Sequence, residues 1–332
     1  MNVPKYHSLM DTARQRLSQA PQANQIVLIY TGIITLAAAV TTTVQFALNS
    51  QISQAGGLRN LGTRSMLSSV SQVLPIAQSL LLLVLEFGYL ACMVRISRGQ
   101  YTSTKTLKAG TDRFWPLLRL TLLKGLIYSA VSFGGIYLAV TVFLFSPFSD
   151  PLVQALTPLL NDSNLLSGNL PVLDAATQQS IMAALRPAYL VVGAVLLALL
   201  LPIYYRYRMA NYVLYDHPEA GAIYALRESR MMMRGQRLAL FRLDLRFWWF
   251  YGLTALVAVV AYGDMILYLL GVALPFSETV GYFLFLFLSL ALQFALYYFL
   301  RNQVKTAYAL VYDSLRPIQK DSGVVLGNIF QM

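Results

Sequence analysis

Charged residues are scarce in this chain. Asp, Glu, Lys and Arg make up 12% of its 332 residues, whereas about a quarter of a soluble globular domain is charged. Hydrophobic residues make up 57%, and the mean hydropathy is +0.57. A soluble helix keeps a polar face, so repeated apolar runs of about 20 residues do not suit a soluble core. The composition predicts one helical bundle in a membrane.

Cysteine and histidine are nearly absent. The single cysteine, Cys92, lies inside an apolar run, which excludes an intrachain disulfide and a multi-cysteine zinc site, and we expect it to be a packing residue. The two histidines, His7 and His217, lie on separate polar segments, so no histidine-rich metal site is expected. No Gly-rich phosphate loop, Ser-His-Asp order or intramembrane pair of acids is visible. We therefore expect no enzyme activity, no cofactor and no metal.

The apolar runs predict an all-α polytopic membrane protein with six transmembrane helices. A signal peptide has an apolar stretch of about 7 to 15 residues, and the first run is longer, so we expect it to be a retained span. The spans are predicted at residues 26–48, 70–94, 116–145, 187–205, 247–274 and 278–300. Polar segments at 1–25 and 301–332 flank this transmembrane domain of residues 26–300.

Basic residues fall mostly on one side of these spans. Of the 25 Lys and Arg residues, 22 lie in the N-terminal segment, in the loops after the second and fourth spans with the base of the third, or in the tail. Because cytoplasmic segments carry an excess of Lys and Arg, both termini and both basic loops are predicted to be cytoplasmic. The net charge of +11 is thereby explained by topology, and no nucleic-acid partner is expected.

The loop after the fourth span is the most basic part of the chain. Asp216 and Glu219 have the spacing of a capping box, and Pro218 falls in the first turn, where proline is tolerated. A helix is predicted over residues 218–235, with Gly235 as its C-terminal stop.

This predicted helix is amphipathic. One face carries small and apolar residues: Ala222, Ala225, Leu226, Ser229, Met232 and Met233. Another face carries Arg227, Arg230, Arg234 and Arg237. Such a helix is typical of a membrane surface, where each Lys or Arg contributes about 1 kcal/mol near anionic lipid. The alternative is that the arginines grip one lipid headgroup or an acidic protein partner.

Two short sequence repeats are visible. LLRLTL at 117–122 parallels LFRLDL at 240–245, and YVLYD at 212–216 resembles YALVYD at 308–313. The matches indicate either repeated hairpin units or merely a shared interfacial composition, because apolar residues are common throughout the chain.

The run ALRESRMMMRGQRLALFRLDLRFWWFYGL, with YVLYDHPEAGAIYA upstream, resembles the signature of a bacterial family of six-span integral membrane proteins, the domain of unknown function nine-seven-five. The matching residues are Asp216, Pro218, Ser229, Met232, Met233, Gly235, Leu240, Phe241, Leu243, Leu245, Phe247 and Trp249. The resemblance implies a multi-pass protein of the bacterial cytoplasmic membrane and implies no activity. The long outer loop at 146–186 departs from the family's compact pattern.

Ionisable residues inside apolar runs are the candidate functional residues. Glu86 is expected to face the bundle interior, because a carboxylate in hydrocarbon is costly. It is either a proton- or cation-coupled site or a structural hydrogen-bond partner of a Tyr or Ser on a neighbouring span. Asp264 either lines an outward cavity or marks a break in its helix. Asp244, with Arg242 and Arg246, is expected to form an interfacial ion-paired collar.

Two classes of function fit these features. The first is a transporter, or a protein handling lipids, amphiphiles or peptides, in which Glu86 faces a cavity between spans and the arginine helix gates its cytoplasmic mouth. The second is a membrane scaffold or partner subunit, in which the basic loops dock another protein or a second copy. In both, anionic lipids are expected partners. Active transport would need ion coupling or a separate ATPase, because nucleotide-binding motifs are missing.

Overall fold

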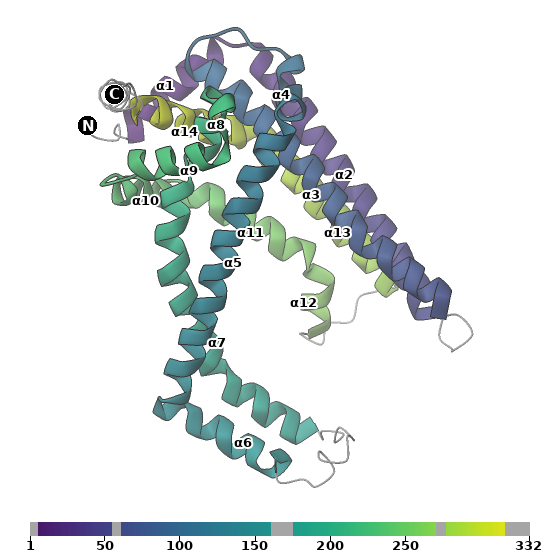
Figure 1. Cartoon of the computed structure of the whole chain (residues 1–332). Coiled ribbons are helices and arrows are strands. Elements are labelled where there is room, and N and C mark those ends of the chain that lie inside the picture. Colours follow the sequence, from purple (N-terminus) through teal and green to yellow (C-terminus); the bar gives the residue numbers. More distant parts are fainter. Residues whose placement is uncertain (1–5, 55–60, 161–174, 270–276, 316–332) are drawn as a thin grey trace. The chain divides into compact units, whose positions relative to one another are not determined.

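The computed structural model describes residues 6–54, 61–160, 175–269 and 277–315. Within these ranges the chain forms helices joined by turns, without a strand, which confirms the predicted all-α class. The longer helices, labelled in Figure 1, are α1 (Tyr6–Ser18), α2 (Gln22–Gln54), α3 (Leu61–Ser97), α5 (Phe114–Leu144), α6 (Asp150–Leu160), α7 (Ala175–Tyr207), α9 (Gly221–Met232), α10 (Arg237–Arg246), α11 (Trp248–Ala261), α13 (Glu278–Leu296) and α14 (Asn302–Leu315).

Several of these helices are long and apolar enough to cross a membrane. Among the described residues there are five: Gln22–Ile52, Ser65–Ser97, Phe114–Leu144, Ala183–Asp216 and Thr279–Leu315. A sixth span results if α10 and α11, which meet at an angle of 62°, are counted together. The chain is therefore a multi-pass membrane protein.

The fourth predicted span differs from the structure at its start. The sequence predicts an outer loop at 146–186 and then a span at 187–205, but α7 (Ala175–Tyr207) is one continuous helix that includes Pro187 and Pro202. Membrane helices tolerate proline because local adjustments and neighbouring groups satisfy the freed backbone carbonyls.

The fifth predicted span, 247–274, is broken. Helix α11 ends at Ala261, and the short helix α12 (Gly263–Leu269) follows it. With 14 residues, α11 has a length of about 21 Å, which is less than the hydrocarbon thickness of about 30 Å. Residues 270–274 lie outside the described part of the chain. A single straight helix is therefore not formed in this region.

The chain divides into two compact units. One consists of Met1–Leu118 and Met209–Met332, and the other of Arg119–Arg208. In the second unit, α5 and α7 approach closely at Gly135, where an added Cβ would lie 3.0 Å from the side chain of Leu196. This unit also contains α6, which packs against α7.

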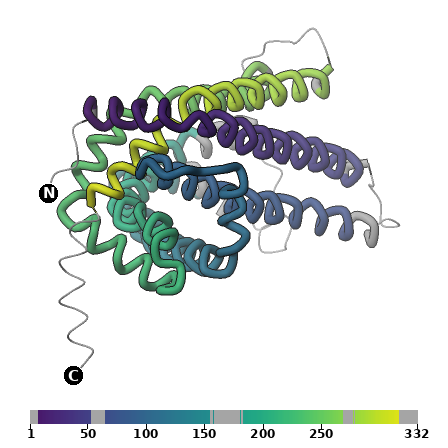
Figure 2. The backbone as a smooth tube through the Cα atoms, turned by 90° about the horizontal axis from the view of Figure 1, so that it is seen from above, coloured from purple at the N-terminus to yellow at the C-terminus, as the bar shows by residue number. Residues whose placement is uncertain are grey.

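The core of the first unit lies between α2 and the second half of α3. These two helices and α13 run alongside one another (Figures 1 and 2). Cys92 is fully buried there, as its place in an apolar run predicts. The core residues are Ala23, Ile26, Val27, Tyr30, Ile34, Leu85, Tyr89, Cys92, Met93, Ile96 and Leu107.

Two glycines let the loop after α3 cross that helix at contact distance. The loop contains the 3-10 helix η2 (Thr104–Lys108) and α4 (Ala109–Asp112). A Cβ added at Gly88 would lie 2.0 Å from the carbonyl oxygen of Leu107, and one at Gly110 would lie 2.1 Å from that of Val84. Neither position has space for a side chain.

Short helices gather at one end of the α2, α3 and α13 bundle (Figure 1). They are α1, α8 (Ala210–Asp216), α9, α10 and α14. Helix α14 packs against α1 and α3, and α8 packs against α3 and α9. The charged side chains described next lie in and beside this layer.

Candidate functional site

Glu86 of α3 is contacted by side chains from two other helical segments. Arg301 donates from Nη2 to Glu86 Oε2 at 2.5 Å, and Lys305 donates from Nζ to Oε1. The hydroxyl of Tyr30 in α2 donates to Glu86 and accepts from Arg301 at 2.7 Å. Arg301 and Lys305 are four residues apart, so they share one helix face. These four residues form what we call the Glu86 cluster.

Aromatic rings surround the guanidinium of Arg301. It lies 4.2 Å from the ring centroid of Tyr297, 5.0 Å from that of Tyr30 and 5.7 Å from that of Tyr89. Tyr30 and Tyr89 stack at 4.2 Å, and the hydroxyl of Tyr89 donates to Asn302 Oδ1 at 2.5 Å. Because cations are attracted to ring faces, these contacts hold Arg301 in place in addition to its ion pair.

A π-helical turn, η5 (Tyr297–Arg301), joins α13 to α14. Such turns contain one extra residue and occur frequently at functional sites. One extra residue rotates the following helix by about 100°. Helix α13 packs against α2 and α11, whereas α14 packs against α1 and α3. The turn therefore lets one continuous helical segment present different faces to different partners, and it brings Arg301 and Lys305 to Glu86.

The Glu86 cluster contains two cations and one carboxylate. The side chains of Glu86 and Lys305 are 33% and 32% exposed, whereas that of Arg301 is 11% exposed. The Nε of Arg301 is buried and has no hydrogen-bond partner among the described residues. The cluster thus has one net positive charge and unused N–H donors. One interpretation of Glu86 was a structural hydrogen bond to a Tyr or Ser on a neighbouring span, and Tyr30 is such a partner. A role of Glu86 in ion coupling stays a prediction.

Arg98, directly after α3, holds two carboxylates. It donates from Nη1 and Nη2 to Asp216 at 2.8 Å each and from Nε to Asp313 at 2.9 Å. Tyr312 donates to Asp216 at 2.7 Å, and Ser97 donates to Asp313 at 2.9 Å. The hydrogen bonds that Arg98 donates to Asp216 and then to Asp313 raise its pKa above the usual value, against the opposing effect of burial. Arg98 is therefore cationic at every physiological pH.

The repeated motifs at 212–216 and 308–313 meet at this arginine. Each motif ends in the aspartate that binds Arg98, and the rings of Tyr212 and Tyr312 stack at 5.2 Å. The repeat thus corresponds to two segments, α8 and the second half of α14, that share one cation.

The capping box expected at Asp216 is not formed. Asp216 is the last residue of α8, and its carboxylate binds Arg98 and Tyr312. The next elements, η4 (Pro218–Ala220) and α9, both begin without a side-chain cap. A charge-assisted bidentate bond to a guanidinium is stronger than a bond to one backbone N–H, and this explains the difference.

The helix predicted over 218–235 corresponds to η4 and α9, and a further helix of the basic loop, α10, begins after Gly235. Gly235 lies between α9 and α10 with φ of +80°, a left-handed conformation that suits glycine. The predicted apolar face of α9 is buried within the protein; its residues are Ala222, Ala225, Leu226, Ser229, Met232 and Met233. Arg227, Arg230 and Arg234 are exposed, and Arg237 is half-buried. The face of α9 available to lipid or to a partner therefore carries these arginines together with exposed apolar side chains such as Ile223 and Met231.

Asp244 lies in the last turns of α10, just before the bend into α11. It accepts a hydrogen bond from the hydroxyl of Tyr308, which is 3.0 Å from the hydroxyl of Tyr251. Phe247, at the bend, is fully buried, and its ring centroid is 5.6 Å from that of Tyr308. These contacts tie α10, α11 and α14 together at the bend, whereas the expected collar with the neighbouring arginines stays a prediction.

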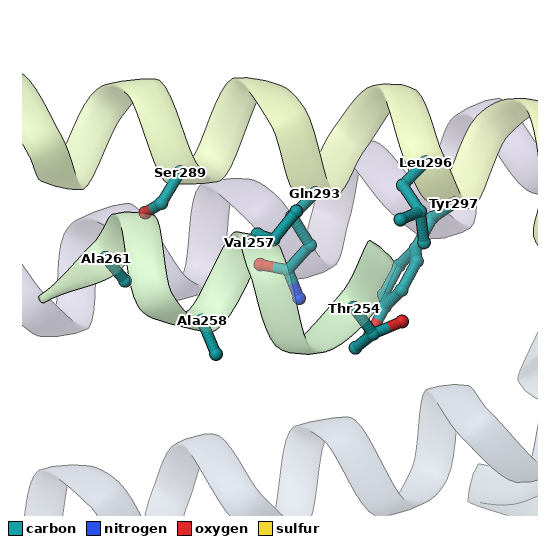
Figure 3. Close-up of a pocket in the computed structure, with 8 residues that line it drawn as sticks. All are labelled: Thr254, Val257, Ala258, Ala261, Ser289, Gln293, Leu296 and Tyr297. Atoms are coloured by element: carbon teal, nitrogen blue, oxygen red, sulfur yellow. The ribbon is translucent and has the colours of Figure 1, made fainter. Parts of the chain in front are cut away.

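A pocket of about 180 Å³ lies between α11 and α13 (Figure 3). Thr254 and Tyr297 lie at one end, Ala261 and Ser289 lie toward the other, and the side chain of Gln293 lies between the two helices (Figure 3). Its lining residues are Thr254, Val257, Ala258, Ala261, Ser289, Gln293, Leu296 and Tyr297. Neither Glu86 nor Asp264 is among them, so this pocket is not the Glu86-lined cavity that the sequence suggested.

Comparison with known proteins gives one match. A family model described as protein of unknown function (DUF975) matches residues 6–317. The chain belongs to this family. No curated protein and no solved structure matches it. The resemblance inferred from the basic loop is confirmed, and it extends over nearly the whole DUF975 chain.

The remaining predicted site residues of this DUF975 chain lie apart from the Glu86 cluster. Asp264 is half-buried in the first turn of α12, at the break after α11. Pro218 begins η4, and Ser229 is fully buried in α9. Phe241 and Trp249 are half-buried in α10 and α11. The structure does not bring the two candidate acids, Glu86 and Asp264, into one described site.

Sequence reasoning missed several charged residues, among them the partners of Glu86 and Asp216. Arg301 and Lys305 were assigned to the basic tail, although their spacing of four residues after an apolar run indicates paired cations on one helix face. Arg98 was counted only as a loop charge. Glu228 was overlooked; it is 6% exposed, and burial raises the pKa of its carboxyl against the lowering effects of His217 and Arg227.

Proposed function

We propose that this chain is a non-enzymatic protein of the bacterial cytoplasmic membrane that binds and moves a lipid, an amphiphile or an amphiphilic peptide between its spans. The observation that carries the proposal is the pocket between α11 and α13. It lies among apolar helices, and its lining combines small apolar side chains with a few polar ones, which is the usual composition of a small-molecule site.

The lining of the pocket is itself amphipathic. Val257, Ala258 and Ala261 line it from α11 with apolar side chains. Ser289 donates its hydroxyl to a backbone carbonyl of its own helix at 2.8 Å. The amide of Gln293 points between the helices (Figure 3), where it can donate to and accept from a ligand. A ligand with an apolar body and one polar group fits such a lining.

The size of the pocket limits what enters it. Its volume of about 180 Å³ is below the range of about 300–1,000 Å³ that holds a whole drug-sized ligand. The pocket therefore takes part of an amphiphile, such as a segment of an acyl chain or one apolar side chain, and the rest stays in the bilayer. This favours membrane-borne ligands over soluble ones.

The arginines of α9 fit the same proposal. Arg227, Arg230 and Arg234 are exposed on one helix, and each contributes about 1 kcal/mol of attraction near an anionic membrane surface. Anionic lipids are thus the proposed partners of this face, which concentrates negatively charged amphiphiles beside the protein.

A wedge placed in the pocket tests the proposal. In proteoliposomes, Ala258→Trp should weaken binding of a fluorescent acyl-chain lipid by about tenfold. The indole ring fills the pocket, so the lipid chain loses most of its apolar contact with the lining. Ala255→Trp, on the same helix but outside the pocket lining, is the matched control. Equal binding and equal transbilayer movement in wild type and both variants would refute the proposal.

A second function, docking of a protein partner or a second copy, is favoured by the exposed side chains beside the arginines. Ile223 is 76% exposed and Met231 is 44% exposed on the same helix. Large exposed apolar residues mixed with arginine are typical of protein interfaces. Co-purification of a stoichiometric partner that is lost when Arg227, Arg230 and Arg234 are replaced by Gln would support docking, and an unchanged monomeric state would count against it.

A further inference from the structure

We infer that the Glu86 cluster is a binding site for a phosphate group carried by the amphiphile, with Lys305 and Arg301 as its ligands. The inference rests on the proposed function and names the headgroup class of its substrate. The argument depends on the charge of the cluster, on its unused donors and on its position relative to the pocket.

The cluster has a cation in excess. Among the residues that the structure describes, Glu86 is the carboxylate that pairs with both Arg301 and Lys305. Two positive charges against one negative charge leave a net charge of one. An uncompensated charge in a partly dehydrated place is costly, so a singly charged anion is stabilised there. A phosphodiester carries one negative charge, which matches the excess.

The unused donors are of the kind that bind phosphate. Lys305 has three N–H donors and makes one side-chain hydrogen bond among the described residues, to Glu86, while its side chain is a third exposed. Arg301 uses Nη2 for Glu86 and Tyr30, and its Nε is buried without a partner among the described residues. A guanidinium edge beside an ammonium group suits phosphate oxygens, which accept charge-assisted hydrogen bonds from both.

The donors are held in place before any ligand arrives. Three tyrosine rings contact the guanidinium of Arg301, and the π-helical turn sets the direction of Arg301 and Lys305. Fixed donors need not be ordered on binding, which favours affinity. Exposure is greatest at Lys305 and Glu86, so a ligand reaches the cluster from that side.

Tyr297 connects the cluster with the pocket. Its side chain lines the pocket between α11 and α13, and its ring lies 4.2 Å from the guanidinium of Arg301. The end of the pocket at which Thr254 and Tyr297 lie (Figure 3) is thus next to the cation of the cluster. The proposed amphiphile would lie with its apolar part against Val257 and Ala258 and with its charged group directed past Tyr297 to Arg301.

The experiment compares an anionic phospholipid with a zwitterionic one in the full-length protein. Both carry a phosphodiester, but the choline cation of the zwitterion is repelled by the net positive charge of the cluster. The probes are short-chain phosphatidylglycerol, short-chain phosphatidylcholine and inorganic phosphate, and binding is measured in uncharged detergent. We expect wild type to prefer phosphatidylglycerol over phosphatidylcholine by about tenfold, the value of one charge-assisted hydrogen-bonded contact. Lys305→Gln should abolish the preference, and Lys305→Arg should retain it.

Two further variants serve as controls. Lys108→Gln removes the same charge at an exposed position of η2 and should leave the preference unchanged. Glu86→Gln removes the carboxylate that competes with the phosphate for the two cations, so it should tighten phosphatidylglycerol binding. If Glu86 is instead a proton site that binding needs, the same variant would weaken binding. If Glu86→Gln does not fold, the two Lys305 variants decide, because Glu86 keeps its bond to Arg301 in both.

The outcomes separate this inference from the proposed function. Binding of inorganic phosphate that depends on Lys305, without a preference between the lipids, supports the site and assigns it to a soluble phosphate. Loss of the preference in Lys305→Gln with no effect of Ala258→Trp supports the site and refutes the pocket. An effect of Ala258→Trp on both lipids, with Lys305→Gln equal to wild type, overturns the inference. Equal binding of every probe by every variant also overturns it.

Discussion

Two glutamates in this chain are stabilised in opposite ways. Glu86 has two cations and a tyrosine as partners, whereas Glu228, on the buried face of α9, has its carboxyl pKa raised by burial against the lowering effects of His217 and Arg227. For a buried carboxylate, pairing favours the charged form and dehydration disfavours it. The side chain of Glu228 is therefore the one whose ionisation opposes folding.

Glu228→Gln should make the protein more stable at neutral pH. Because the folded-state pKa of Glu228 lies above its usual value of 4.5, the stability due to the protonated carboxyl is complete below that value and is lost as pH rises through the folded pKa. Urea unfolding of the purified protein should show Glu228→Gln more stable than wild type by about 1 kcal/mol at about pH 8. The two should converge at about pH 4.

Glu219→Gln is the control for this prediction, because Glu219 is exposed on η4 in the same region. It should leave the pH dependence of wild type intact. A Glu228→Gln protein that is less stable than wild type at high pH would show that the ionised carboxylate has a stabilising partner.

At the residue scale the sequence identifies the acid but not its partners. Glu86 stands out because it interrupts an apolar run, which is a local property. Its cations are 215 and 219 residues away along the chain, and no local spacing encodes a pairing of that separation. The same holds for Arg98 and Asp313, which are 215 residues apart.

At the scale of helices, periodicity predicts faces well. The apolar face assigned to α9 from a period of 3.6 residues is the buried face. The bends are not predictable in this way. The break after α11 and the π-helical turn depend on packing against α13, α2 and α3, which are distant in sequence, and the capping box failed because Arg98 bound Asp216 instead.

The crossing of α3 by the loop that contains η2 and α4 is testable through its glycines. Gly88→Ala and Gly110→Ala each place a methyl group about 2 Å from a backbone carbonyl oxygen, so each should destabilise the protein by about 3 kcal/mol, the upper part of the range for overpacking. Thermal unfolding in detergent measures the loss.

Gly32→Ala provides the comparison within α2. Apart from its chain neighbours and the backbone of its own helix, nothing lies within 4 Å of the added Cβ. Alanine is the better helix former by about 1 kcal/mol, so this variant should be as stable as wild type or more so. Equal unfolding temperatures of Gly88→Ala, Gly110→Ala and Gly32→Ala would contradict the close approach of the loop to α3.

At the scale of the whole molecule, composition alone predicts a membrane protein with several spans, because 57% hydrophobic residues in long runs leave few alternatives. The division into two units does not follow from the sequence. It depends on which helices contact one another, and residues 119–208 contact one another more than they contact the rest.

Cysteine labelling tests the predicted orientation. Cys92 is fully buried, so the wild-type protein gives a low background. A single cysteine in place of Asp150, which is exposed, should react with a membrane-impermeant maleimide in intact cells. A cysteine in place of Lys108 should react only after the membrane is opened, because basic loops are retained in the cytoplasm. Reversed labelling would invert the topology.

The cations of the Glu86 cluster come from η5 and α14, late in the chain, and this determines when the cluster is completed. A ribosome makes Glu86 215 residues before Arg301, and Asp313 reaches Arg98 later still. During synthesis, the Glu86 carboxylate of α3 therefore has neither of its cationic partners until Arg301 and Lys305 have been made and inserted. A chain that terminates before residue 301 lacks both cations, and it is expected to be removed by proteolysis in the cell, since incompletely folded chains are degraded preferentially.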